Sequence, residues 1–120
     1  MAITVIQRGD WKLVPPEQRG AGAGAKLLGQ SVLREDPCLF ILEEPPNYYT
    51  SAHSHTEQEV IVVLEGRMMF NGQWVEQGTV VHVPANEDYW HATGAERCVV
   101  ALMRPTKKGN IRYAREATAE

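Results

Sequence analysis

Short apolar stretches recur along the chain, and residues that favour turns separate them. Most stretches are too short for an ordinary helix, and no helical periodicity runs through them. Asn71-Gly72, between two such stretches, is a strong signal for a two-residue β-hairpin. Short strands divided by turns predict an all-β sandwich or barrel. The strands that we expect cover residues 11–14, 26–35, 38–42, 48–55, 57–64, 67–70, 73–76, 79–83, 89–93 and 98–103.

The length of 120 residues fits a single domain spanning residues 1–120. Hydrophobic residues make up 43% of the chain, which is enough for a core. We expect the core over about residues 26–104, an N-terminal arm over 1–25 and a C-terminal tail over 105–120. Within the tail, residues 111–120 are expected to form a short helix or a frayed end.

Charge and cysteine content narrow the classes of function. The net charge is −3 and no basic patch is present, so nucleic acid is not an expected partner. No apolar run approaches the roughly 18 residues of a membrane span, and the N-terminus lacks a secretory signal. Cys38 and Cys98 are too few and too far apart for a disulfide framework, so we expect reduced cysteines and a cytoplasmic location.

Three polar residues before an apolar strand form the strongest candidate site. His53 and His55 are two residues apart, so in a strand both side chains point to the same face. Glu59 has the same parity and can join them. Two imidazoles and a carboxylate on one face suit a divalent transition metal. The pattern therefore predicts a metal site at the edge of the core.

The segment from His53 to Gly66, with the pattern His-x-His-x3-Glu-x6-Gly, resembles the first conserved motif of the cupins. The glycine that usually stands six residues before the first histidine is Asn47 here, and asparagine tolerates the same left-handed backbone.

A second motif matches less completely. Gly78 and Pro84 fit the second cupin motif, whereas Asn86 replaces its glycine and Ala95 stands at its closing asparagine. The usual histidine would fall at Tyr89, while the histidine nearby is His91. We interpret residues 85–90 as a loop lengthened by two residues, which returns His91 to the same face as the other ligands. We expect this loop to determine substrate selectivity.

The resemblance covers about residues 37–103 and implies an all-β, single-domain double-stranded β-helix, the jelly-roll or cupin barrel. It also implies one metal ion held by four residues; Fe(II) is favoured, and Zn, Mn, Ni or Cu also suit the ligands. His82 competes for the last position, but it alternates with Val81 and Val83 and is expected to face outward. The ligands implied are His53, His55, Glu59 and His91.

The remaining side chains give a weaker picture of the substrate. Aromatic and methionine side chains expected near the metal suit an aromatic, polyketide-like or weakly polar small molecule. Arg67 and Arg104 are expected in surface salt bridges rather than on a substrate carboxylate. The candidate substrate contacts are Tyr49, Met69, Trp74, Tyr89 and Trp90.

The resemblance favours a metal-dependent dioxygenase of a diketone or phenolic compound, with Glu59 as the catalytic base. A non-redox isomerase, cyclase or lyase is the first alternative, and a non-catalytic cupin that binds a small ligand is the second. We also expect a homodimer formed through the N-terminal segment and the sheet that contains residues 99–103.

Overall fold

The computed structural model describes residues 3–7, 12–13, 28–106 and 111–113. Within these ranges every regular element is a β-strand, and no helix is long and apolar enough to cross a membrane. The strands are β1 Lys12–Leu13, β2 Leu28–Arg34, β3 Cys38–Glu44, β4 His53–His55, β5 Glu59–Glu65, β6 Arg67–Phe70, β7 Gln73–Glu76, β8 Val80–Val83, β9 His91–Ala92, β10 Cys98–Arg104 and β11 Ile111–Tyr113.

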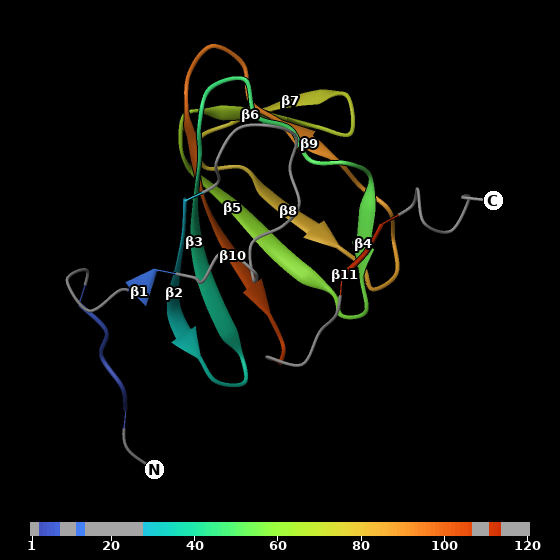
Figure 1. The fold of residues 1–120 in the computed structure, drawn as a ribbon. Helices are drawn as coiled ribbons and strands as arrows, with labels where there is room; N and C mark the ends of the chain where they lie inside the picture. Colours follow the sequence, from blue (N-terminus) through green and yellow to red (C-terminus); the bar gives the residue numbers. More distant parts are fainter. Residues whose placement is uncertain (1–2, 8–11, 14–27, 107–110, 114–120) are drawn as a thin grey trace.

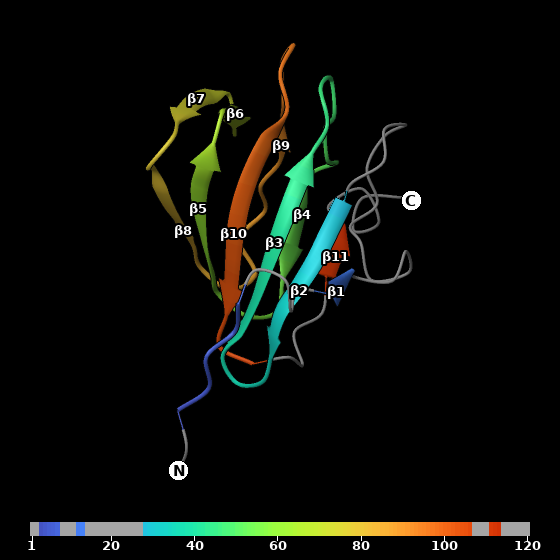
Figure 2. The same ribbon diagram turned by 90° about the vertical axis from the view of Figure 1, so that its left-hand side faces the viewer.

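The strands form one large sheet and two small ones. The large sheet is antiparallel with the order β1-β2-β3-β10-β5-β8, and the small sheets are β7-β6-β9 and β11-β4. Figures 1 and 2 show β4 and β9 across the molecule from β3 and β10. The core therefore lies between two layers, and the all-β prediction is confirmed.

Alternate side chains of the central strands point inward and fill the space between the layers. Ile61 and Val63 of β5 are buried opposite Leu102 and Val100 of β10, and all four belong to one hydrophobic cluster. Each such side chain stabilises the fold by roughly 1.5–3 kcal/mol when fully buried. Glu59 begins β5 in the same phase as Ile61, so the sheet carries this carboxylate toward the interior as well.

The predicted turns are confirmed where backbone angles test them. Asn71 and Gly72 have φ values of 49° and 88°, as a type I′ hairpin between β6 and β7 requires. Asn47 and Asn86 also have positive φ values, 58° and 64°, at the positions where the cupin motifs usually have glycine. Asparagine tolerates this conformation better than most residues, which explains why the replacements keep the fold.

Three elements differ from the sequence prediction. The strand expected over residues 48–55 is reduced to His53–His55, with Tyr49 in an isolated bridge to Ala92. Strand β3 continues beyond residue 42 to Glu44. Residues 111–113 form neither a helix nor a frayed end: they pair antiparallel with β4. Predictions for residues 8–11, 14–27 and 114–120 lie outside the described residues.

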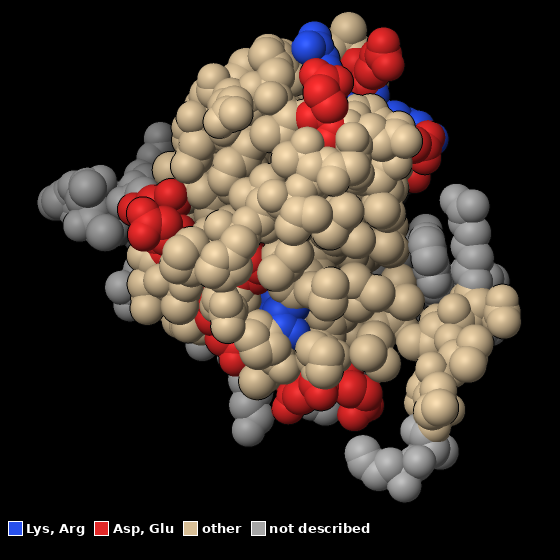
Figure 3. Space-filling model, turned by 180° about the vertical axis from the view of Figure 1, so that it is seen from behind, with Lys and Arg blue, Asp and Glu red and all other residues tan. Residues whose placement is uncertain are grey.

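The outer surface of the large sheet carries several exposed apolar side chains. Leu64 and Val80 are exposed on β5 and β8, and Met103 is exposed on β10. Figure 3 views the molecule from behind, where the edge strand β8 lies; most charged side chains there lie near the edges of the view, and a small group lies near its centre. The exposed apolar side chains of β5, β8 and β10 therefore suit an apolar contact.

Candidate functional site

Three buried histidines gather between the layers. His53 and His55 come from β4, and His91 comes from β9. The ring centroids of His53 and His55 are 5.1 Å apart, and those of His53 and His91 are 6.4 Å apart. The three rings therefore lie in one small region of the interior.

Backbone pairing between Tyr89 and His53 explains how His91 reaches this place. The His53 N–H donates to the Tyr89 carbonyl at 2.9 Å, and the Tyr89 N–H donates to the His53 carbonyl at 2.8 Å. Before this pair, the Asn86 N–H donates to the His55 carbonyl at 2.7 Å. The segment that we interpreted as a lengthened loop therefore runs along β4 and delivers both Tyr89 and His91 to the interior.

His82 does not join the cluster. Its side chain is exposed on β8, and its Nε2 lies 2.9 Å from Gln58 Oε1. Val81 and Val83, its neighbours, pack in or against the core, as the alternation predicted. The structure thus brings His91, and not His82, beside His53.

Hydrogen bonds fix the tautomers of two histidines. His53 Nδ1 lies 2.7 Å from the Ser51 carbonyl oxygen, which can only accept, so the proton is on Nδ1 and the lone pair is on Nε2. His91 Nδ1 likewise faces a carboxylate oxygen, Glu44 Oε1, at 3.0 Å. Histidines that bind metals commonly donate their other ring N–H to a carbonyl or carboxylate in this way.

Burial also favours neutral imidazoles. It lowers the pKa of His53, and it lowers the pKa of His55 to about 4. At neutral pH both rings therefore offer a lone pair, as a divalent ion requires of its ligands.

Glu59 lies beside the histidines but is engaged by other groups. The Tyr89 hydroxyl donates to Glu59 Oε1, and Arg104 Nε donates to Oε2 at 2.8 Å. His55 Nε2 is 3.6 Å from Oε1. Burial, followed by the charge of Glu59, raises the pKa of Tyr89, so the phenol stays a proton donor at neutral pH.

The three histidines have the right chemistry to bind a divalent ion, but His91 lies farther from His53 than a bound ion would require. Within the described residues, no group of three or more His, Cys, Asp or Glu side chains is arranged to hold a metal ion. Two imidazoles on one tetrahedral ion have ring centres about 5 Å apart, given a metal–nitrogen distance of about 2.1 Å. The His53–His55 separation meets this value, while His91 would have to approach His53 by about 1 Å.

Sequence reasoning missed two charged residues here. Arg104 was expected at the surface, and instead it pairs with buried Glu59; Arg67 does form an exposed pair, with Glu76. Glu44 lies beyond the strand expected over residues 38–42, and it is buried against His91. The sequence could have placed both side chains inward, because alternate residues of a strand point to the same face. Arg104 follows inward-facing Leu102 by two residues, and Glu44 follows Leu42 by two residues.

The predicted substrate contacts fall mostly one residue from the inward positions. Tyr89 lies in the site, stacked on Phe70 with ring centroids 5.1 Å apart. Tyr49, Trp74 and Trp90 are 50%, 38% and 37% exposed, while their neighbours Tyr48, Val75 and Tyr89 point inward. Met69 likewise follows Met68, which is fully buried. A shift of one residue in a strand reverses the face, so the neighbours of these residues, rather than the residues themselves, point to the interior.

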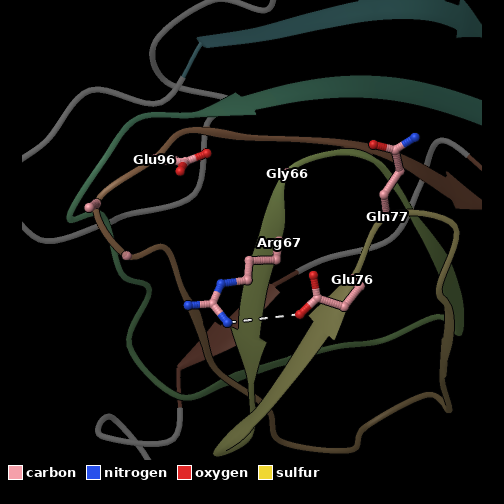
Figure 4. Close-up of a pocket in the computed structure, with 7 residues that line it drawn as sticks. Gly66, Arg67, Glu76, Gln77 and Glu96 are labelled. Carbon is pink, nitrogen blue, oxygen red and sulfur yellow. Dashed lines mark ion pairs between the residues drawn. The ribbon is translucent and has the colours of Figure 1, made fainter.

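A separate pocket of about 370 Å³ lies at the other end of the hairpin (Figure 4). Arg67 and Glu76 pair across it at 3.8 Å. None of the three histidines lines it, so this pocket is distinct from the histidine cluster. Its lining residues are Gly66, Arg67, Glu76, Gln77, Gly94, Ala95 and Glu96.

Comparison with known proteins identifies the fold. No protein-family model matches the chain, and no curated protein matches its sequence. Among solved structures, the chain is similar to the polyketide cyclase RemF from Streptomyces resistomycificus, with 20% identity and a TM-score of 0.78 over 94% of this chain and 86% of that one.

Two further solved structures agree. A cupin-like protein from Thermotoga maritima is 18% identical, with a TM-score of 0.63 over 80% of this chain and 85% of that one. An RmlC-like cupin from Ralstonia eutropha is 11% identical, with a TM-score of 0.71 over 88% of this chain and 70% of that one. The chain therefore has the cupin fold, and the predicted double-stranded β-helix is confirmed.

Proposed function

We propose that this protein is a non-redox cyclase that closes a ring in a poly-β-carbonyl compound, with a divalent ion held by His53, His55 and His91. The observation that carries this proposal is the position of Glu59. Its carboxylate lies beside the histidines, but Tyr89 and Arg104 bind its two oxygens. We therefore assign the carboxylate as a base and the three histidines as the metal ligands. The similarity to a polyketide cyclase supports the same choice.

The histidines and the acid–base pair have different tasks in this proposal. His53, His55 and His91 would hold a divalent ion, which would supply Lewis-acid polarisation of a substrate carbonyl oxygen. Glu59 is the general base that removes a proton from the carbon between two carbonyl groups. Tyr89 is the proton donor, since its hydroxyl is protonated and already bonded to Glu59.

The reaction balances without an oxidant. Glu59 takes one proton from the substrate carbon, and that carbon forms a bond to a second carbonyl carbon of the same molecule. The electron pair of the attacked C=O bond moves to its oxygen, which takes a proton from Tyr89. Tyr89 is then reprotonated by Glu59 through their hydrogen bond. Loss of one water from the resulting alcohol gives the unsaturated ring.

The walls of the site suit a flat substrate. Phe70 stacks on Tyr89 with an interplanar angle of 15°, and it is nearly parallel to His91 at 3°. Phe40 lies under the Arg104 guanidinium at 5.6 Å. Flat apolar groups with few charges favour a planar, weakly polar chain of carbonyl groups.

The test measures the metal content of protein purified without added metal and its activity on a linear aryl tetraketone, in which a carbon between two carbonyl groups can attack the fourth carbonyl and close a six-membered ring. We expect ring closure with loss of one water under anaerobic conditions. Glu59→Gln should retain metal and lose at least about 100-fold in kcat, in line with the usual contribution of a general base. His53→Ala should lose metal, and His82→Ala is the matched control because this histidine is exposed on β8.

The dioxygenase that the sequence favoured stays a prediction, and the same preparation separates it from the cyclase. Oxygen uptake with Fe(II) restored, together with no anaerobic product, would replace the cyclase by an oxygenase. If His53→Ala leaves the metal content unchanged, the site assignment itself fails.

A further inference from the structure

We propose that Glu44 is a positioning residue, which orients His91 and supplies the negative charge that draws a divalent cation to the histidine cluster. This inference rests on the proposed function, because it requires that His91 hold the ion. It adds a charged residue from β3 to the histidines of β4 and β9 and the ion pair of β5 and β10.

The geometry around Glu44 is unusual for a carboxylate. The residue is 0% exposed at the end of β3, opposite Cys98 of β10. Its Oε1 accepts the hydrogen bond from His91 Nδ1 at 3.0 Å. Within the described part of the chain, its Oε2 is buried without a hydrogen-bond partner, and its one ion-pair partner is His91.

Glu59 provides the comparison within the same site. It is equally buried, but its two oxygens have partners in Tyr89 and Arg104, and the guanidinium supplies a full positive charge. A buried carboxylate that lacks such compensation is strongly disfavoured. Glu44 therefore needs a positive charge close by, and the described part of the chain offers no arginine or lysine that pairs with it.

A cation beyond His91 would meet this need. With its Nδ1 proton directed at Glu44, His91 has its Nε2 lone pair on the opposite side of the ring. A carboxylate behind a histidine fixes the orientation of the ring and makes its other nitrogen a stronger ligand. Because Glu59 is paired with Arg104, Glu44 is the acidic residue whose charge remains for the ion.

A cation bound by His91 would also explain why the core contains a carboxylate, Glu44, with one oxygen that lacks a partner among the described residues. Buried polar groups without full partners are uncommon, and they often mark functional sites rather than structural ones. The preceding residue, Glu43, shows the ordinary alternative, since it lies on the outer side of β3 and pairs with Arg97 at 3.6 Å.

The experiment measures Zn²⁺ affinity by competition with a chromophoric chelator in the full-length wild type, Glu44→Gln and Glu43→Gln. Glutamine can still accept the His91 hydrogen bond but carries no charge. We expect Glu44→Gln to weaken binding about 10- to 100-fold, as is usual when a partner of a metal-binding histidine is removed. Glu43→Gln changes the net charge of the protein equally and should bind as the wild type does.

A second readout separates positioning from a purely structural role. In EDTA, the melting temperature of Glu44→Gln should equal or exceed that of the wild type, because a poorly compensated buried charge is gone. The Co²⁺ absorption spectrum of the variant should also differ from that of the wild type. A variant that is less stable in EDTA, or whose affinity and spectrum match the wild type, would overturn the inference. In the last case wild-type metal binding and ring closure would persist, so the proposed function would stand; if the wild type bound no Zn²⁺ or Co²⁺, both would fail.

Discussion

Arg104 Nε lies 2.8 Å from Glu59 Oε2, and this ion pair joins the last residue of β10 to the first residue of β5. The two strands are antiparallel neighbours in the large sheet, so both residues arrive at the same end of the barrel. The pair fixes the carboxylate that we propose as the base. It also means that the stability of this end of the barrel depends on both charges, because each compensates the other.

Replacement of Arg104 tests this dependence. Arg104→Met leaves Glu59 buried without its cation, and we expect a loss of about 2–4 kcal/mol in the free energy of unfolding, somewhat below a fully buried pair because Arg104 is partly exposed. Glu59→Gln with Arg104→Met should cost less than the sum of the single changes. Urea unfolding of the four proteins gives the coupling. Arg97→Met, which breaks partly exposed pairs with Glu43 and Glu65, should cost no more than about 1 kcal/mol. Additive effects at the Arg104 pair would contradict the expected dependence on the buried charge.

Stability should fall in mild acid because of the buried histidines. The pKa of His55 is about 4 in the folded protein, against about 6.5 in an unfolded chain. Between these values the unfolded chain binds the extra proton, so stability rises with pH over this window and is lost as the pH falls from about 6.5 to about 4. The loss from His55 is on the order of 3 kcal/mol.

Urea midpoints between pH 4 and pH 8, measured in EDTA, check this slope. His55→Asn should flatten it, whereas His82→Asn should leave it unchanged because the His82 side chain is exposed. An identical slope in the wild type and in His55→Asn would rule out His55 as its source.

Gly66 should be far less replaceable than the hairpin glycine. Gly66 has a φ of 76°, and a Cβ there would lie 2.6 Å from the Arg97 carbonyl oxygen. Gly72 has a φ of 88°, and a Cβ added there would meet no other atom within 4 Å. We therefore expect Gly72→Ala to cost about 1 kcal/mol from backbone strain alone, and Gly66→Ala about 2–4 kcal/mol. Equal melting temperatures for the two variants would mean that the close approach to Arg97 is unimportant.

We predict a homodimer that uses the apolar outer face of the large sheet. Val80 is 62% exposed on the edge strand β8, and Leu64 and Met103 are exposed on β5 and β10. Light scattering coupled to size exclusion should give twice the monomer mass. Val80→Glu should shift the protein toward the monomer, since it places a charge in an apolar contact. Tyr49→Glu, in the segment bridged to Ala92, is the control that should remain dimeric.

Local patterns predicted the strands well. The limits of β6 and β7 and the turn between them followed from Asn71-Gly72, because turn geometry depends on adjacent residues. Placement of side chains on the two faces was less secure. Met69 was favoured over Met68, and Trp90 was counted with Tyr89, because aromatic and sulfur-containing residues at successive positions carry no signal of which one faces inward.

The sequence by itself determined that His53, His55 and Glu59 share one face, since alternation along a strand is a property of the local chain. It also determined the cupin fold, through its strands, turns and motif spacing. Only the tertiary structure decided that the Tyr89 hydroxyl and Arg104 bind Glu59, and that Glu44 stands behind His91. These contacts join residues 30 to 47 positions apart, and their geometry depends on how distant strands are paired and packed rather than on any local pattern.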